Sequence, residues 1–485
     1  MKRSKHNLSN YKLATMDMGK LVPVQVQEVL PGDTMRMETS ALVRLSPMLA
    51  PVMHPVTVRF HHWFVPNRLV WDQWEDFITG AEDIQIPKYT FDNTVPDGSI
   101  LDYMGIPSPT SGSLSINALP LRAYNLIFNE FYRDQDLVSE RVEHDISLAT
   151  VAWRKDYFTA ARPWAQKGED IVLPIGTEAP VISNGNPLQV HFGDGYNHDL
   201  AVTTDGGTTL PGRVYAADTD QTHDDIPMIF GTDTGLKADL SSATGISATE
   251  FREFFALQRY NEARARYGSR YTEYLRYLGV TPSDARLQRP EYIGGGKSTV
   301  QISEVLQTAY DGGQTPVGTL RGHGITAVRT RSAKKFFEEH GYVITLMSVI
   351  PKSIYQDGVH RTWLRTDKED FYQKELQHVG QQEVKLGEVY AKSPDSVGNI
   401  FGYQDRYSDY TSTPSQVAGE FRNELDYWHL ARKFDQAPGL NSTFISCDPS
   451  KRIFAEQTKH SLWCMINNKC VARRMVKNVS VGRLM

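Results

Sequence analysis

Residues 56–64 read VTVRFHHWF, in which valine or phenylalanine occupies positions 56, 58, 60 and 64 and polar residues mostly stand between them. A period of two predicts a β-strand that buries one face. The same alternation appears over residues 22–27 and 35–38, and again at 300–302. Residues 343–350 (VITLMSVI) are apolar on both faces, as expected of a strand buried between two layers. The sequence therefore predicts a chain built mainly of β-strands.

Helical periodicity appears between these strands. Pro120 stands at a favourable first helical position, and apolar residues then recur at spacings of three and four up to residue 131. A shorter helix is predicted over 71–80, and a long one over 247–279 with a break at Gly268. Because no alternating βαβ order is present, we expect one antiparallel sandwich over residues 1–485 whose connections are expanded by helices and loops.

Composition narrows the class of protein. The chain has 485 residues, of which 40% are hydrophobic and 22% charged, and this excludes a mostly disordered, collagen-like or coiled-coil chain. Three cysteines cannot build a disulfide scaffold, so a reducing compartment is expected. The basic start lacks the apolar run of a signal peptide, and no apolar stretch approaches the length of a membrane span, so we expect no membrane insertion.

Positive charge is concentrated at both ends of a chain whose overall charge is −5. Residues 1–16 form a basic N-terminal arm and residues 457–485 a basic C-terminal segment, and neither contains an acidic residue. Such ends attract polyanions, although solvated tails of this composition also occur in proteins that bind no nucleic acid. Charge alone leaves both interpretations open.

Residues 178–245 differ in kind from the rest of the chain. They contain ten acidic residues against only Arg213 and Lys237, together with many glycines and strings such as TTDGG. This composition is typical of loops, and a loop of such length within a folded chain is usually functional. We interpret residues 178–245 as an exposed surface insertion. This composition is also compatible with short hairpins inside the insertion.

No sequence pattern predicts catalysis, a cofactor or a metal ion. GGGKS at 294–298 ends like a phosphate-binding loop, but Glu291 stands where that loop needs a glycine, so a flexible glycine turn is predicted. His61 and His62 are adjacent on a predicted strand and point to opposite faces, which prevents chelation of one ion. The acidic stretch around Asp220 does not match a calcium loop. We therefore predict that the protein is not an enzyme.

Arginine and tyrosine alternate along residues 258–277. Such a mixture can stack on single-stranded bases, but the same two residue types are enriched in protein interfaces, and we favour a subunit contact. The candidate interface residues are Arg259, Tyr260, Arg264, Arg266, Tyr267, Arg270 and Tyr271.

Several long segments resemble one known family. They are PVTVRFHHWFVPNRLVWDQWEDFITG at 55–80, ALPLRAYNLIFNEFYRDQD at 118–136, VAWRKDYFTAARPWAQKG at 151–168, RLQRPEYIGGG at 286–296, GYVITLMSVIPKSIYQDGVHRTW at 341–363 and FGYQDRYSDY at 401–410. In this order they resemble the major capsid proteins of the microviruses, small single-stranded-DNA bacteriophages, and specifically their gokushovirus branch. The resemblance covers essentially the whole chain.

The resemblance implies an eight-stranded antiparallel jelly roll, a viral β-sandwich with long inserted loops and several helices. It implies that sixty copies close a T=1 icosahedral shell around circular single-stranded DNA, and that the chain resides in the virion after assembly in the bacterial host cytoplasm. The implied partners are other copies of the chain, the packaged DNA, a small basic internal DNA-binding protein, scaffolding and minor or pilot proteins, and a host surface receptor.

Under this reading the insertion 178–245 builds a protrusion at each threefold axis and contributes to host attachment. The candidate host-binding residues are Asp205, Asp218, Asp220, Asp224 and Asp225. The basic termini face the interior and contact genome phosphates. The candidate DNA-facing residues are Lys2, Arg3, Lys5, Arg473, Arg474 and Lys477.

One alternative comes from a different class of protein. A β-sandwich enzyme or lectin acting on polysaccharide would use tyrosine and tryptophan to stack on sugars and paired carboxylates for acid–base catalysis. The sequence contains enough carboxylates to leave such a pair possible, whereas microscopy would separate uniform shells from small oligomers.

Overall fold

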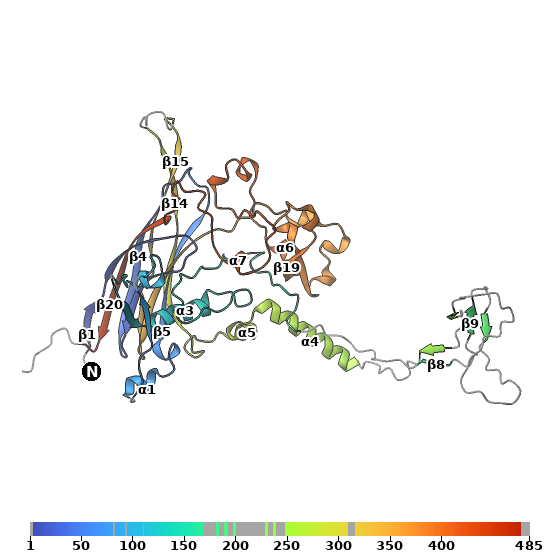
Figure 1. Cartoon of the computed structure of the whole chain (residues 1–485), viewed down its shortest axis with the longest axis horizontal. Helices are drawn as coiled ribbons and strands as arrows, with labels where there is room; N and C mark the ends of the chain where they lie inside the picture. The colour runs from blue at the N-terminus through green and yellow to red at the C-terminus, as the bar shows by residue number, and fades with distance from the viewer. Residues whose placement is uncertain are drawn as a thin grey trace, which may run out of the picture. The chain divides into compact units, whose positions relative to one another are not determined.

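A computed structural model describes residues 3–80, 83–92, 95–109, 111–168, 181–183, 189–192, 197–199, 228–230, 236–238, 248–308 and 316–476. The chain divides into two compact units, one made of residues 1–167 and 261–485 and the other of residues 168–260. The first unit is built on two antiparallel sheets (Figure 1). The prediction of a mainly β chain is therefore confirmed.

The larger sheet has seven strands among the described residues. They are β1 (Ser4–Asn7), β2 (Asn10–Met16), β4 (Thr34–Leu45), β14 (Gln301–Leu306), β15 (Leu320–Arg329), β16 (Ala333–Phe336) and β20 (Leu462–Arg474). Its central path runs β1-β20-β4-β15-β14, with β2 paired to β20 and β16 paired to β4. The hairpin of β14 and β15 projects beyond the other strands (Figure 1).

The smaller sheet has the order β13-β5-β17-β3. Its strands are β3 (Val22–Val29), β5 (Val56–Pro66), β13 (Glu291–Thr299) and β17 (Gly341–Pro351). The two sheets enclose a common core, because one buried cluster contains Val43 and Ile466 from the larger sheet and Val58, Phe60 and Met347 from the smaller one. The alternation that marks β5 in the sequence thus results from burial of its valines and phenylalanine between the sheets.

Strand pairing in the two sheets is nested. The first of the eight strands involved pairs with the last, so that β2 lies against β20, β3 against β17, β4 against β15 and β5 against β13. Consecutive strands of this series lie alternately in the larger and the smaller sheet, except that β5 and β13 both lie in the smaller one. Each strand in the first half of this series therefore has an antiparallel partner in the second half.

Helix α3 (Leu119–Phe131) covers the outer face of the smaller sheet. Its Leu121 and Ile127 share a buried cluster with Ile344 of β17, and the Tyr124 hydroxyl donates to the Leu21 carbonyl at 2.6 Å. Strand β17 is consequently buried along its whole length, as its sequence predicts. Burial of each such large side chain contributes about 1.5–3 kcal/mol.

The glycine run at 294–298 is part of β13 and does not form a turn, so that prediction was wrong. A Cβ at Gly295 would lie 2.1 Å from the Phe60 carbonyl oxygen, and one at Gly296 would lie 2.8 Å from Thr330 Cα. Glycine is present because the neighbouring backbone approaches too closely for a side chain.

The other short elements of the first unit lie in its long connections. They are η1 (Asn67–Leu69), α1 (Trp74–Thr79), β6 (Lys88–Asp92), α2 (Ile100–Tyr103), β7 (Ser113–Asn117), η2 (Arg361–Leu364), η3 (Lys368–Asp370), η4 (Lys374–Leu376), β18 (Gln381–Lys385), η5 (Leu386–Glu388), η6 (Pro394–Ser396), β19 (Ile400–Asp405), α6 (Ser408–Thr411), η7 (Gly419–Arg422), η8 (Asp426–Trp428) and α7 (Ser442–Ile445). The predicted short helix is confirmed as α1, which ends at Gly80 with φ of 93°.

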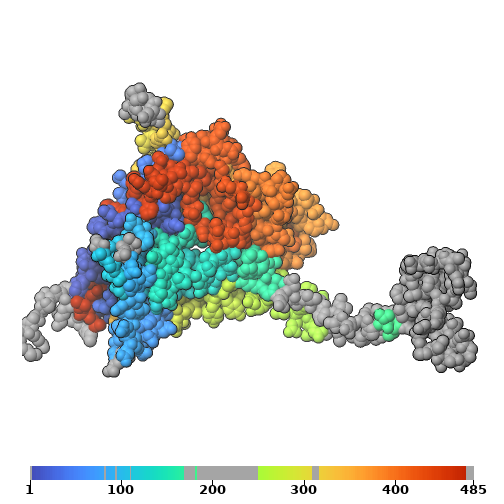
Figure 2. Space-filling model, viewed as in Figure 1, coloured from blue at the N-terminus to red at the C-terminus, as the bar shows by residue number. Residues whose placement is uncertain are grey.

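The connection from β17 to β20 folds into a lobe with a core of its own. Figure 2 shows this lobe in orange, with dark blue and red atoms side by side where the two ends of the chain pair. Phe401, Phe444 and Tyr355 are buried together in the lobe, and the Arg432 guanidinium lies 4.1 Å from the centroid of the Phe444 ring. The same guanidinium also lies over the rings of Tyr355 and Phe434, so aromatic packing and cation–π contacts stabilise the lobe.

The second unit contains short strands among its described residues. They are β8 (Val181–Ser183), β9 (Gln189–Phe192), β10 (Asn197–Asp199), β11 (Met228–Phe230) and β12 (Leu236–Ala238). β8 pairs with β12, and β9 pairs with both β10 and β11. Short hairpins therefore occur within 178–245.

The long helix predicted over 247–279 is confirmed as α4 (Ala248–Tyr267) and α5 (Tyr271–Tyr277), which are separated at Gly268.

Candidate nucleic-acid interface

A basic hollow of about 490 Å³ lies on the seven-stranded sheet, on the face opposite the core. Alternation along β20 places Lys469 and Arg473 on this face, while the intervening Cys470 is buried. Pairing then sets Lys5 of β1 opposite Arg473, and Arg36 of β4 opposite Val471. The residues that line the hollow are Arg3, Lys5, Thr34, Arg36, Glu38, Ser332, Lys334, Lys469, Val471 and Arg473.

Positive charge in this hollow is not balanced within the described part of the chain. Six of the lining side chains are cationic, and Glu38 is the one carboxylate among them. Glu38 already accepts a hydrogen bond from Arg329, which lowers the pKa of its carboxyl group. The surplus of cations on an open, concave surface is suited to binding an anion with several charges.

The structure brings together half of the residues that the sequence suggested for DNA contact. Arg3, Lys5 and Arg473 all line the hollow, and Arg3 Nη1 donates to the Gly32 carbonyl at 2.7 Å. Arg474 does not belong with them, because its guanidinium bonds at 2.7 Å to the fully buried carboxylate of Asp33. Lys2 and Lys477 lie outside the described residues.

Three further lining cations were missed by the sequence analysis, namely Arg36, Lys334 and Lys469. Arg36 stands between Met35 and Met37, Lys334 lies in an internal stretch with other cations, and Lys469 lies within the basic C-terminal segment without having been singled out. Their common face follows from the pairing of β4 with β16 and β20. Alternation would have shown that Lys469 and Arg473 share a face, but no local signal identifies the strands beside them.

The arginine- and tyrosine-rich helices expose most of the residues proposed for subunit contact. Arg259, Tyr260, Arg264, Arg266, Tyr267 and Tyr271 are exposed. Arg270 is different, since it is partly buried and donates to the carbonyls of Asn129 and Arg133 at the end of α3. Burial lowers the pKa of Arg270, and its role within the chain is to cap α3. The five candidate aspartates at 205–225 lie outside the described residues.

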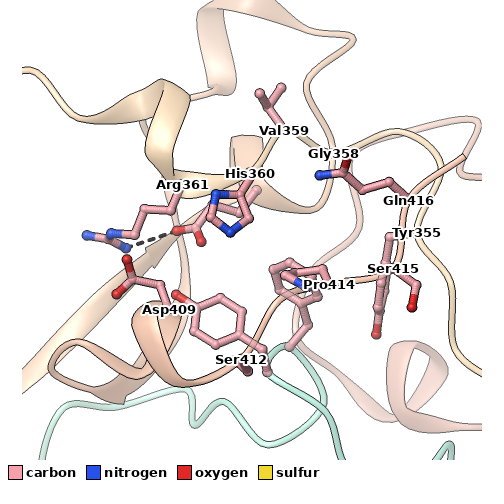
Figure 3. Close-up of a pocket in the computed structure, with 13 residues that line it drawn as sticks. Tyr355, Gly358, Val359, His360, Arg361, Asp409, Ser412, Pro414, Ser415 and Gln416 are labelled. Carbon is pink, nitrogen blue, oxygen red and sulfur yellow. Dashed lines mark hydrogen bonds and ion pairs between the residues drawn. The ribbon is translucent and has the colours of Figure 1, made fainter. Parts of the chain in front are cut away.

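A small cavity lies in the C-terminal lobe (Figure 3). Arg361 and Glu388 form a buried ion pair of 2.9 Å at its wall, and Asp409 and Tyr355 also line it. Its volume is about 20 Å³, which suits a single water molecule and no substrate. Burial raises the pKa of Glu388 despite the neighbouring guanidinium. The cavity is therefore part of a structural charge network.

The cysteines and the two adjacent histidines show no sign of reactivity or metal binding. Cys447, Cys464 and Cys470 are buried and unpaired, and burial raises the pKa of each thiol to about 11 or 12, which suppresses the reactive thiolate. His61 lies 2.6 Å from the Tyr132 hydroxyl, whereas His62 contacts Thr345 between the sheets, so the two rings do occupy opposite faces. Within the described ranges no group of metal-binding side chains is present, and no helix is long and apolar enough to cross a membrane.

Comparison with known proteins decides the class. The sequence model of the family described as Capsid protein (F protein) matches residues 1–482. The chain belongs to this capsid protein family. It is therefore a structural phage protein that resides in the virion and is not an enzyme, and the alternative of a polysaccharide-degrading sandwich is rejected.

Three curated relatives are similar over most of their length. Capsid protein VP1 of Bdellovibrio phage phiMH2K is 37% identical over 91% of this chain and 87% of its own. Capsid protein VP1 of Chlamydia phage 1 is 32% identical over 99% of this chain and 95% of its own. Capsid protein VP1 of Spiroplasma virus 4 is 31% identical over 92% of this chain and 88% of its own. All three belong to the Microviridae, as the resemblance implies.

Proposed function

We propose that this chain is the major capsid protein of a gokushovirus-type microvirus, and that sixty copies close a T=1 shell around circular single-stranded DNA. The observation that carries the proposal is the basic hollow on the seven-stranded sheet, where Glu38 is the one carboxylate among the described lining residues. A polyanion on this face supplies the missing charge and releases its own counterions.

The proposed fold is the eight-stranded jelly roll. Nested pairing of β2, β3, β4 and β5 with β20, β17, β15 and β13 supports it, because rolling one long hairpin produces two sheets of four strands in this order. Strands β1, β14 and β16 extend the larger sheet. The jelly roll tolerates long insertions between strands, and the connection between β5 and β13 carries residues 178–245.

Subunit contact is assigned to exposed aromatic and apolar side chains. On α4 and α5 these include Tyr267 and Tyr271, with exposed fractions of 44% and 64%. The projecting hairpin adds Val305, Leu306 and Val317, each at least half exposed. Large exposed apolar groups of this kind favour burial against neighbouring copies. Arg259, Tyr260, Arg264 and Arg266 extend the proposed contact.

The insertion 178–245 is proposed to form the threefold protrusion and to contact the host receptor through its acidic residues. Deleting 178–245 should leave shells intact and abolish attachment to host cells. Unchanged attachment would reject the assignment.

The six cations that line the basic hollow in each chain are far fewer than the phosphates of a genome, so a small basic internal protein is expected to supply further positive charge. Scaffolding and pilot proteins remain proposed partners for assembly.

The proposal is tested by expressing the chain with a single-stranded replicon and purifying assembled material. Electron microscopy should show uniform particles with T=1 symmetry, and the nucleic acid released from them should be degraded by a nuclease specific for single strands. Small oligomers alone, or particles of another triangulation number, would contradict the proposal.

A further inference from the structure

A second, apolar surface continues the basic hollow along the same sheet face. Along β20 the outward positions are Trp463, Met465, Asn467, Lys469, Val471 and Arg473, spaced about 6.7 Å apart. The last three line the basic hollow, whereas Trp463 and Met465 line a separate shallow hollow of about 500 Å³. One strand therefore connects a cationic half of the face with an apolar half.

Neighbouring strands widen the apolar half into a strip. Pairing places Leu13 of β2 and Leu42 of β4 on either side of Met465, and Arg44 beside Trp463. Tyr11 follows on β2, where Asn467 Nδ2 donates to its hydroxyl at 3.4 Å. We define the aromatic strip as Tyr11, Leu13, Leu42, Trp463 and Met465.

The aromatic strip is unusually exposed for its composition. Leu13 is 80% exposed, Tyr11 73%, Met465 49% and Trp463 47%. Contiguous apolar groups of this size on a soluble surface mark a binding site. The occupant must also suit the adjoining cations, because both halves share β20 and β4.

We infer that the aromatic strip stacks the unpaired bases of the same single strand whose phosphates lie over the basic hollow. Three observations support nucleic acid as the occupant. The strip contains no acidic side chain, its one lining charge is the cation Arg44, and it runs without a break into the cationic half. Aromatic side chains beside a basic groove are the usual means of binding single strands without regard to sequence.

The consequence is a preference for single strands over duplexes. A duplex offers phosphates to Lys5 and Arg473 but keeps its base faces stacked internally, so Tyr11 and Trp463 gain nothing from it. This inference rests on the proposed genome-facing role of the sheet and adds the bases to the phosphates as ligands.

The test compares oligothymidylate with an abasic deoxyribose-phosphate oligomer of equal length, each titrated into the purified full chain. Wild-type protein should bind oligothymidylate at least about tenfold more tightly, since stacking on one aromatic side chain is commonly worth that factor. The double variant Y11A/W463A should bind both oligomers with the affinity that wild type shows for the abasic one. Trp463 emission should be quenched by oligothymidylate alone.

Matched variants separate stacking from folding. Because Tyr11 and Trp463 are exposed, their removal opens no core cavity, and Y11F/W463F should keep the preference for bases. Trp363, which is 80% exposed in η2, provides the control W363A, which should behave as wild type.

Each remaining outcome has a distinct meaning. Equal binding of both oligomers by wild type would overturn the inference while leaving the proposed phosphate contacts intact. Failure to bind either oligomer would contradict the proposed function itself. If Y11A/W463A keeps the preference but no longer forms shells, the strip is a contact between copies of the chain and the inference is wrong.

Discussion

Lys5 and Arg473 lie directly opposite each other on β1 and β20, and both side chains are exposed. Like charges at directly opposed positions of an antiparallel pair are destabilising. No carboxylate of the basic hollow relieves them, because Glu38 is already bonded to Arg329. The two strands thus hold a repulsive pair that an anion over the face would stabilise.

Reversing one of these charges should separate stability from DNA binding. R473E converts the repulsive pair into an attractive one, so the free energy of unfolding of the free chain should rise by about 0.2–1 kcal/mol. The affinity for oligothymidylate should fall about tenfold or more, because an anion replaces a cation beside the phosphates. Chemical denaturation and binding titrations measure the two effects. K368E reverses a charge in η3 that is 87% exposed and pairs with Glu369, and it should leave the affinity for oligothymidylate unchanged.

Salt should weaken binding to single strands steeply. If all six lining cations meet phosphates, the logarithm of the binding constant should fall with the logarithm of salt concentration with a slope of about −4. Replacing Lys334 or Lys469 with glutamine should each reduce the slope by about 0.7. Replacing Arg474, which pairs with Asp33, should leave the slope unchanged and lower stability instead. A slope unaffected by K469Q would exclude this residue from the interface.

The buried pair of Arg361 and Glu388 should respond differently to acid after loss of each partner. R361M leaves a carboxylate buried without its cation, and the free energy of unfolding at neutral pH should fall by about 3–5 kcal/mol. Burial already raises the pKa of Glu388, so mild acid should protonate this carboxyl group and make the loss in R361M smaller. E388Q instead leaves a guanidinium buried without its anion, and because arginine stays protonated, acid should not relieve this loss. Denaturation of both variants relative to the wild type at pH 7 and pH 5 provides the measurement, and a loss in R361M that does not shrink at pH 5 would contradict the prediction.

Buried histidines predict loss of stability in mild acid. Burial lowers the pKa values of His54, His61 and His62 to about 4, below the ordinary 6.5 of the unfolded chain. Between pH 6.5 and pH 4 these histidines are protonated in the unfolded chain but remain neutral in the folded chain. The free energy of unfolding is therefore highest above pH 6.5 and declines as the pH falls towards 4. Within that window each histidine lowers the free energy of unfolding by about 1.4 kcal/mol for every unit by which the pH falls.

The control for this pH dependence is H62Q, which removes one titrating ring while keeping a polar group near Thr345. Its free energy of unfolding should fall less steeply between pH 6.5 and 4.5 than that of the wild type. Identical slopes for the two proteins would show that His62 does not contribute.

Local patterns predicted the strands and helices well because those patterns are produced by burial. The alternation in β5 and the largely apolar sequence of β17 both reflect contact with core layers, and α3 follows from its apolar spacing. The glycines of β13 were misread, since a strand that needs glycine for close backbone approach has the same composition as a turn.

The basic hollow could be predicted only in part. Charge at the chain ends identified Arg3, Lys5 and Arg473, but the pairing of β1 with β20 joins residues more than 460 positions apart. No local property of either segment specifies that partner. Arg474 illustrates the same limit, because its role depends on the proximity of Asp33. The aromatic strip was missed for the same reason, since Tyr11 and Trp463 become neighbours only after β2 pairs with β20.

The most direct test of the central claim is a cryo-electron microscopy reconstruction of nuclease-treated particles assembled from this chain. The account predicts that Lys5, Lys469 and Arg473 face the interior and lie against density for nucleic acid. A reconstruction that places these side chains on the outer surface, or against an interior free of nucleic acid, would contradict it.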